Sequence, residues 1–246
     1  KLILFPISYK QQKNSARMQR VNPKMEKLRQ KYEEALACSE IEGISIATRA
    51  DCLPADVLSL LAELHKKTNL WVELGLQTAD ARSAAFIRRG YPLSVFTQAV
   101  YALAEHNIPV VVHIILGLPG ESRETVLRTI DYLNRLPIQG VKLQLLHVLS
   151  DSDLADLYRA GEYTPLKKEE YLTLVGDCIA HLRADIVLHR LTGDGDKNTL
   201  LAPLWSLRKR DVLNRLHRYL KENHIRQGMS CKIDRSVIYN KPKDVL

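Results

Sequence analysis

The stretch WVELGLQTADARSAAFIRRG, from Trp71 to Gly90, combines the alternation of a β-strand with polar residues that a buried strand rarely carries. Glu73 and Gln77 occupy alternating positions, so both side chains point to the same side of an extended strand. Burying a carboxylate and an amide costs several kcal/mol unless both have partners. The stretch therefore predicts a strand whose polar side contacts a ligand.

The rest of the chain repeats the same alternation of strand and helix. Strands are expected over 2–8, 41–49, 70–78, 108–117, 139–149 and 184–192, and helices over 22–36, 54–67, 94–107, 122–136, 152–161 and 167–182. A basic helix over about 203–222 and a tail that is irregular or a short strand complete the chain. Repeated strand–helix units predict a parallel sheet with helices outside it, and periodicity leaves open whether the sheet closes into a barrel.

Composition supports a globular protein with a sizeable core. The 246 residues are 46% hydrophobic and 26% charged, which suits one large α/β domain and excludes a disordered chain. No run reaches the ~18 to 20 apolar residues that cross a bilayer, and no signal peptide opens the chain, so we expect a cytoplasmic protein. The net charge of +8 permits binding to a polyanion, although a solvated basic face is the simpler interpretation.

Unusual polar residues collect where the predicted strands end. In parallel α/β folds the ligand lies beyond the carboxyl ends of the strands, where the strand-to-helix loops gather. The residues at these ends are Arg49 and Asp51, Glu73 and Gln77, His113, Lys142, Gln144 and His147, and His189. Arg49 with Asp51 is equally well explained as an ion pair within a loop, and His113 alone as a core histidine. Their convergence across five strands nevertheless predicts a pocket.

The sequence GLPGE, from Gly117 to Glu121, follows an apolar strand and precedes a helix. Its two glycines allow the backbone to approach a ligand closely, and Pro119 fixes the turn. A strand-to-helix turn formed only for its own geometry is the alternative.

Together these motifs resemble the radical SAM superfamily, and within it the YhcC-like proteins, which are relatives of the elongator-type radical SAM enzymes. The resembling stretches are 43–54, 71–78, 88–90, 113–121, 140–148 and 189–205, in the order and spacing of the family. The resemblance implies an α/β fold, a partial (βα)6 TIM-type barrel of the radical SAM kind. We expect this barrel over residues 1–200 and a C-terminal helical extension, a basic helix and tail, over 201–246.

The resemblance also implies the cofactors and the residues that contact them. Such enzymes use a [4Fe-4S] cluster, reduced by a flavodoxin or ferredoxin, to cleave S-adenosylmethionine to a 5′-deoxyadenosyl radical that abstracts hydrogen from a substrate. The implied cofactor-binding residues are Glu73, Gln77, Arg88, His113, Ile115, Gly117, Pro119 and Gly120. Residues implied to line a substrate or cofactor pocket are Arg49, Asp51, Lys142, Gln144, His147 and His189. No catalytic residue and no metal ligand is assigned.

The cysteines depart from the family pattern. The family holds its cluster through a CxxxCxxC loop, whereas the cysteines here are Cys38, Cys52, Cys178 and Cys231. We therefore expect the chain to be N-terminally truncated, with the first strand and cluster loop missing and residues 2–8 as the second barrel strand. On this hypothesis the chain alone lacks radical chemistry.

Other functions remain as alternatives. One is a non-catalytic nucleotide- or RNA-binding scaffold derived from such an enzyme, and another is binding of RNA or another polyanion through the basic helix over 206–227. An ordinary barrel aldolase or hydrolase needs a nucleophile or carboxylate pair, and neither is convincingly placed. The substrate and the oligomeric state do not follow from the sequence.

Overall fold

The computed structural model describes residues 26–27, 29–38, 40–193 and 195–233. The chain divides into two compact units, residues 1–45 with 53–70 and residues 46–52 with 71–246. The strands are β1 (Gly43–Thr48), β2 (Asn69–Gln77), β3 (Val110–Leu116), β4 (Gly140–Leu145), β5 (Val148–Leu149), β6 (Val187–Arg190) and β7 (Leu200–Ala202). The helices are η1 (Ala50–Cys52), α2 (Ala55–His65), α3 (Ala81–Phe86), α4 (Leu93–Glu105), α5 (Arg123–Leu133), α6 (Asp153–Arg159), α7 (Lys168–His181), η2 (Leu204–Leu207) and α8 (Lys209–Glu222).

Two helical stretches lie in the described part of the smaller unit. Residues 26–36 are helical wherever they are described, and the Arg29 guanidinium donates to Glu63 of α2 at 2.7 Å. Apolar residues at helical spacing, Leu60, Leu61 and Leu64, bury one face of α2. The first residues of the helix expected over 22–36 lie outside the described part of the chain.

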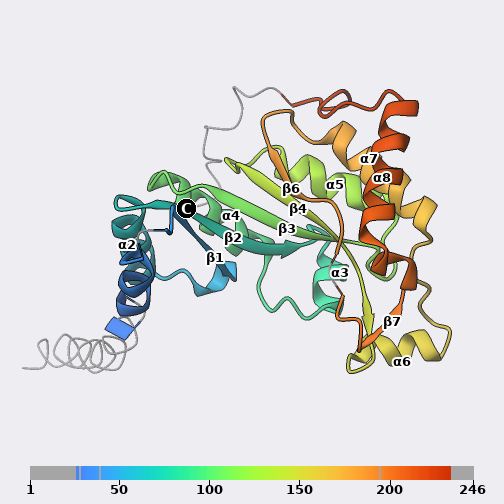
Figure 1. Cartoon of the computed structure of the whole chain (residues 1–246), viewed down its shortest axis with the longest axis horizontal. Helices are drawn as coiled ribbons and strands as arrows, with labels where there is room; N and C mark the ends of the chain where they lie inside the picture. The colour runs from blue at the N-terminus through green and yellow to red at the C-terminus, as the bar shows by residue number, and fades with distance from the viewer. Residues whose placement is uncertain (1–25, 28, 39, 194, 234–246) are drawn as a thin grey trace, which may run out of the picture. The chain divides into compact units, whose positions relative to one another are not determined.

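The larger unit is built around a parallel sheet in the order β1-β2-β3-β4-β6 (Figure 1). β3 pairs in parallel with both β2 and β4, and β4 pairs in parallel with β6. The alternation read from the sequence separates the two faces, because successive side chains of a strand point in opposite directions. One face is apolar and fully buried, with Leu74, Val112 and Leu143 as representatives. The other carries the polar residues that predicted a site.

Buried residues of α4, α5 and α7 complete the apolar core. Phe96 of α4, Ile130 of α5 and Tyr171 of α7 are fully buried. α8 lies beside α7 (Figure 1), where Gly176 leaves space for a ring: a Cβ at this glycine would lie 2.8 Å from Cε1 of Tyr219. The C-terminal helix expected from the sequence is therefore present and packed, while a domain boundary at residue 200 stays a prediction.

Several elements differ from the sequence-based expectations. The strand expected over 139–149 is wrong as one element, because the chain turns after Leu145 and β5 pairs antiparallel with β7 instead. The basic helix begins only at Lys209, after the short 3-10 turn η2. α3 and β7 were not predicted, since both are short and lack a long periodic pattern. The α/β class with a parallel sheet is confirmed. The strand expected over 2–8, as the second strand of the barrel, lies outside the described residues. Among those residues, no helix has the length and apolar character needed to cross a membrane.

Candidate functional site

The polar face of the sheet carries a network centred on the carboxylate of Glu73 in β2. Lys142 of β4 donates its ammonium to Glu73 Oε2 at 2.5 Å, and His113 of β3 lies 2.6 Å from the same oxygen through Nε2. The amide nitrogen of Gln144, also on β4, lies 2.9 Å from His113 Nδ1. The parallel register places His113 directly opposite Lys142, so neighbouring strands supply the whole network. The sequence predicted that these polar groups contact a ligand, but many of their hydrogen bonds are made to one another within the protein.

The hydrogen bonds fix the protonation state of His113. An amide nitrogen only donates, so Nδ1 accepts from Gln144, and the ring proton is on Nε2, facing the Glu73 carboxylate. Burial lowers the pKa of His113 below its usual 6.5, and the hydrogen bond that it donates to Glu73, which acts in the opposite direction, does not restore it. Positive charge on Lys142 and Arg190 lowers it further. At neutral pH His113 is therefore an uncharged donor to Glu73.

This lowered pKa makes the stability of the fold depend on pH. The unfolded chain takes up a proton on His113 near pH 6.5, whereas the folded chain does so only at lower pH, so protonation favours unfolding. We expect the free energy of unfolding to be highest above pH 6.5 and to fall as the pH drops below it. In His113→Gln, urea denaturation should show a shallower fall below about pH 6.5, because the group that takes up the proton is gone. An unchanged pH profile would contradict the assignment.

Beside this network lies a polar hollow of about 320 Å³. Its wall includes Glu73, Gly75 and Gln77 of β2, His113 of β3, Thr48 at the end of β1 and Arg49 directly after it. The register shifts between Gly75 and Gln77, and Gln77 has a φ of +66°, which turns its amide back over the glycine. A Cβ at Gly75 would lie 2.8 Å from Gln77 Nε2. The absence of a side chain at Gly75 therefore leaves room for the Gln77 amide at this wall of the hollow.

Arg89 and Tyr91 hold the irregular end of β2 in place. The buried Arg89 guanidinium donates to the carbonyl oxygens of Leu76 at 3.3 Å and Thr78 at 2.7 Å. The Tyr91 hydroxyl donates to the carbonyl of Gly75 at 2.5 Å. These bonds satisfy carbonyls near the bulge, which would otherwise be costly to bury. Arg89 therefore has a structural role in the wall of the hollow, with its guanidinium bound to backbone carbonyls.

Arg49 and Asp51 form an ion pair at the rim of this hollow. The Arg49 guanidinium binds both Asp51 oxygens at 2.9 Å, also donates to the Arg89 carbonyl at 2.9 Å, and lies 5.3 Å from the centre of the Tyr91 ring. The loop-stabilising alternative thus has direct support, while Arg49 still lines the hollow. The Arg49 guanidinium also holds the pKa of Asp51 below its usual value.

The Gly117–Glu121 turn links neighbouring strand ends. Gly117 has a φ of +91°, and a side chain there would meet Leu166, while the Tyr163 hydroxyl donates to the Gly117 carbonyl at 2.8 Å. Glu121 accepts a hydrogen bond from Thr78 at 2.6 Å, and burial raises the pKa of its carboxyl. Gly120, with a φ of +76°, has open space around it. The described contacts thus account for Gly117 and Glu121 as structural residues of the turn.

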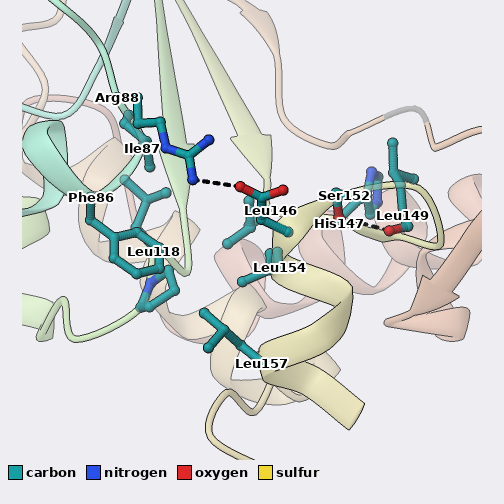
Figure 2. A pocket seen from close by; sticks show the side chains of 12 residues that line it. Phe86, Ile87, Arg88, Leu118, Leu146, His147, Leu149, Ser152, Leu154 and Leu157 are labelled. Carbon is teal, nitrogen blue, oxygen red and sulfur yellow. Dashed lines mark hydrogen bonds and ion pairs between the residues drawn. The ribbon is translucent and has the colours of Figure 1, made fainter. Parts of the chain in front are cut away.

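A second hollow of about 560 Å³ adjoins this turn and is mainly apolar (Figure 2). Side chains from the end of α3, the turn after β3, the loop after β4, and α6 line it: Phe86, Ile87, Leu118, Leu146, Leu154 and Leu157. Pro119 and His147 also contribute to the wall. Arg88 lines both hollows and pairs with Asp153 at 2.6 Å, with about 80% of each side chain exposed.

The remaining predicted residues lie at different places. His147 Nε2 lies 3.0 Å from the Ser206 hydroxyl, and its ring packs under Gly193 and Gly195. The exposed His189 lies over Gly140, where a Cβ would approach its ring to 2.5 Å. Ile115 is half-buried on β3, on the polar face opposite Gln144. The structure thus joins Glu73, His113, Lys142 and Gln144 and sets His147 and His189 apart; the ligand roles of all the predicted residues stay predictions.

Part of the site carries little signal in the sequence. Tyr91, Phe86 and the leucines of α6 carry no motif, and only the three-dimensional fold brings them to the strand ends. An aromatic residue directly after RRG was the one available signal for Tyr91.

The cysteines do not form a cluster site within the described residues. Cys38, Cys52, Cys178 and Cys231 are all free thiols, and burial raises the pKa of Cys178 far above its usual value. No group of three histidine, cysteine, aspartate or glutamate residues in that part of the chain could hold a metal ion.

Comparison with protein families gives the site its context. The model of the radical SAM superfamily matches residues 11–133, half of the chain, and that of the Radical_SAM C-terminal domain matches residues 138–222. The chain belongs to the radical SAM superfamily. The two matches cover both the strands that carry the polar network and α8.

Two curated relatives place this radical SAM protein among YtqA- and YhcC-like proteins. It is 40% identical to YtqA of Bacillus subtilis over 204 residues, which are 83% of this chain and 63% of that protein. It is 33% identical to YhcC of Escherichia coli K12 over 199 residues, 80% of this chain and 64% of that protein. The chain thus spans a little under two thirds of the length of either relative.

The structure of an archaeal Elp3 from Methanocaldococcus infernus shares the fold. The two superpose with a TM-score of 0.65 at 18% sequence identity, over 75% of this chain and 43% of Elp3. At this identity the likeness speaks for the fold alone.

The two cofactors of radical SAM proteins fit the described residues differently. The polar hollow offers the Gln77 amide and the Glu73 carboxylate on one parallel strand, and such groups suit the hydroxyl and amino groups of S-adenosylmethionine. An iron–sulfur cluster needs several thiolate ligands together, and the described residues supply no such set.

Proposed function

We propose that this chain contributes the S-adenosylmethionine-binding part of a radical SAM enzyme, with the cofactor in the polar hollow. The observation that carries the proposal is the irregular end of β2, where Gly75 and the Gln77 amide that lies over it line the hollow at the carboxyl end of the sheet. Ligands of open α/β folds bind at this end, because backbone groups and loop residues converge there.

The residues of the hollow have distinct tasks in this proposal. Gln77 offers one amide donor pair and one acceptor oxygen to the ribose or methionine part of the cofactor. Oε2 of Glu73 is held by Lys142 and His113, and Oε1 lies 3.5 Å from the indole nitrogen of Trp71, so the carboxylate is a fixed group in the wall of the hollow. When bound and reductively cleaved in a complete enzyme, S-adenosylmethionine supplies a 5′-deoxyadenosyl radical that abstracts hydrogen. We assign no step of the cluster to the described residues, because they offer no ligands for it.

Equilibrium dialysis with radiolabelled S-adenosylmethionine tests the proposal on the 246-residue chain. We expect saturable binding, and about tenfold weaker binding in Gln77→Gly, because one ligand hydrogen bond is lost. Glycine adopts the φ of +66° at this position without strain, so the fold should be unchanged. Asn107→Gly is the matched control, since Asn107 also has a positive φ, +57°, and does not line the hollow. Equal affinities for both variants would refute the proposed site.

The alternative of a non-catalytic scaffold predicts the same binding but no chemistry. The enzyme and scaffold hypotheses predict different results for a longer protein that includes a CxxxCxxC segment and is reconstituted with iron and sulfide. Formation of 5′-deoxyadenosine under reduction, with flavodoxin or ferredoxin as the electron donor, would favour the enzyme. Its absence in a protein that holds the cluster would favour the scaffold.

A polyanion partner, such as RNA, is a second proposal, favoured by the exposed basic face of α8. Val212 and Leu216 are buried, while Arg210, Arg218 and Lys221 are exposed. If this face binds RNA, the logarithm of the affinity should fall linearly with the logarithm of salt concentration, and Arg210→Glu with Arg218→Glu should reduce the slope by about two. Filter binding at several salt concentrations measures this; a slope near zero would contradict RNA binding.

A further inference from the structure

The apolar hollow has a composition unlike that of the polar hollow beside it. Its wall is mostly hydrocarbon, from Phe86, Ile87, Leu118, Leu146, Leu154 and Leu157. Phe86 keeps half of its surface exposed at this wall. A large exposed aromatic residue among leucines in a concave surface is typical of a binding site for an apolar group.

The polar atoms in the wall are already engaged within the protein. The Ser152 hydroxyl donates to the Leu149 carbonyl at 2.7 Å, and His147 bonds to Ser206 at 3.0 Å. A ligand rich in hydrogen-bonding groups, such as a sugar or a nucleobase, would leave its own polar groups unsatisfied against such a wall. The wall therefore favours a hydrocarbon group.

The charged side chains in the wall of the apolar hollow are those of Arg88 and its partner Asp153. The pair joins the end of α3 to the start of α6, and about 80% of each side chain is exposed. An exposed pair of this kind is weak, so a ligand carboxylate or phosphate can replace Asp153 on the guanidinium at little cost. Arg49, Arg88 and Arg89 line the adjoining polar hollow with Glu73; Asp51 pairs with Arg49, Asp153 with Arg88 and Lys142 with Glu73, which leaves the charge of Arg89 in excess. The shared rim is thus positive and favours an anionic group over a cationic one.

We infer that the apolar hollow binds the hydrocarbon part of an anionic amphiphile, such as an acyl chain, with the anionic end on Arg88. This inference rests on the proposed function, because it names the substrate class of the same site. Ile87 and Arg88 line both hollows, so such a ligand would lie next to the proposed cofactor. Hydrogen abstraction by a radical requires this adjacency, since the reacting atoms must come into contact.

Isothermal titration calorimetry with three probes of one chain length tests the inference: decanoate, decanol and decyltrimethylammonium. We expect one-to-one binding of decanoate with a negative heat-capacity change, the sign of apolar burial. Decanol should bind about tenfold more weakly, because it lacks the charge-assisted bond to Arg88, and the cation more weakly still. Absence of decanoate binding, or equal affinity for the cation, would overturn the inference.

Variants separate the two parts of the site. Phe86→Glu brings a carboxylate into the hollow from a half-exposed position and should weaken decanoate binding more than tenfold by repulsion and lost contact. Leu204→Glu, at a position 61% exposed and outside the hollow, is the matched control and should bind normally. Arg88→Gly suits the φ of +53° and should weaken decanoate but not decanol. Decanoate binding that survives both Phe86→Glu and Arg88→Gly would place the probe elsewhere and overturn the inference.

S-adenosylmethionine binding to the unaltered chain is measured in parallel. Decanoate binding without cofactor binding would refute the proposed function but would support an anionic amphiphile as the ligand of the apolar hollow. Cofactor binding without decanoate binding would refute the inference alone.

Discussion

Replacing Glu73 by alanine lowers the free energy of unfolding by about 3 kcal/mol, the low end of the range for breaking a buried ion pair. The physical reason is the state of its partners. Lys142 keeps its charge at 15% side-chain exposure, and His113 loses the acceptor of its Nε2 proton at 21% exposure. Urea denaturation followed by circular dichroism measures the change. The double variant Glu73→Ala with Lys142→Met should recover about half of the loss, because it removes the stranded charge.

The Arg88–Asp153 pair provides the matched control for this prediction. It has a similar distance, 2.6 Å, but both side chains are about 80% exposed. Asp153→Ala should therefore cost less than about 1 kcal/mol. Equal losses for Glu73→Ala and Asp153→Ala would show that the network on the polar face is not the buried structural element described above.

Replacing Gly75 by leucine reduces the affinity for S-adenosylmethionine by about 100-fold, equivalent to ~3 kcal/mol of steric cost. The backbone of Gly75 does not need glycine, because its φ is not in the left-handed region, so leucine should fold normally. Its side chain would occupy the polar hollow and displace the Gln77 amide, which is 2.8 Å from the position of a Cβ. Equilibrium dialysis measures the affinity, and thermal denaturation checks the fold.

A graded series makes the result specific to the hollow. Gly75→Ala should weaken binding by about tenfold, because its single methyl group displaces only the flexible end of Gln77. Ala160→Leu adds bulk at an exposed position after α6, outside the polar hollow, and should leave the affinity unchanged. Unaltered affinity in Gly75→Leu would mean that the cofactor does not occupy this hollow.

The strands and the sides on which their polar residues lie followed from the sequence. Alternation in β2 and β3 distinguishes the two faces directly, so the sequence placed Glu73, Gln77 and His113 on the polar one. It did not show that Glu73 is already bound by Lys142 and His113, because register between strands sets those contacts. The polar residues in β2 therefore predicted polar partners, and side chains of the neighbouring strands supply some of these partners.

Irregular features of the site lay beyond sequence reasoning. The bulge that turns Gln77 depends on a positive φ at a residue that seldom adopts one. The buried role of Arg89 depends on the carbonyls that this bulge exposes, while its neighbour Arg88 in the same motif is exposed. The apolar hollow needs Phe86, Leu118 and Leu157 together, which are far apart in the chain and carry no shared motif.

The central claim, that the polar hollow is the S-adenosylmethionine site, is tested most directly by a crystal structure of this chain with the cofactor bound. The account predicts the cofactor against Gly75 and Gln77, with the Gln77 amide within hydrogen-bonding distance of its ribose or methionine part. A cofactor bound outside the residues that line this hollow, with Gln77 still folded over Gly75, would contradict it.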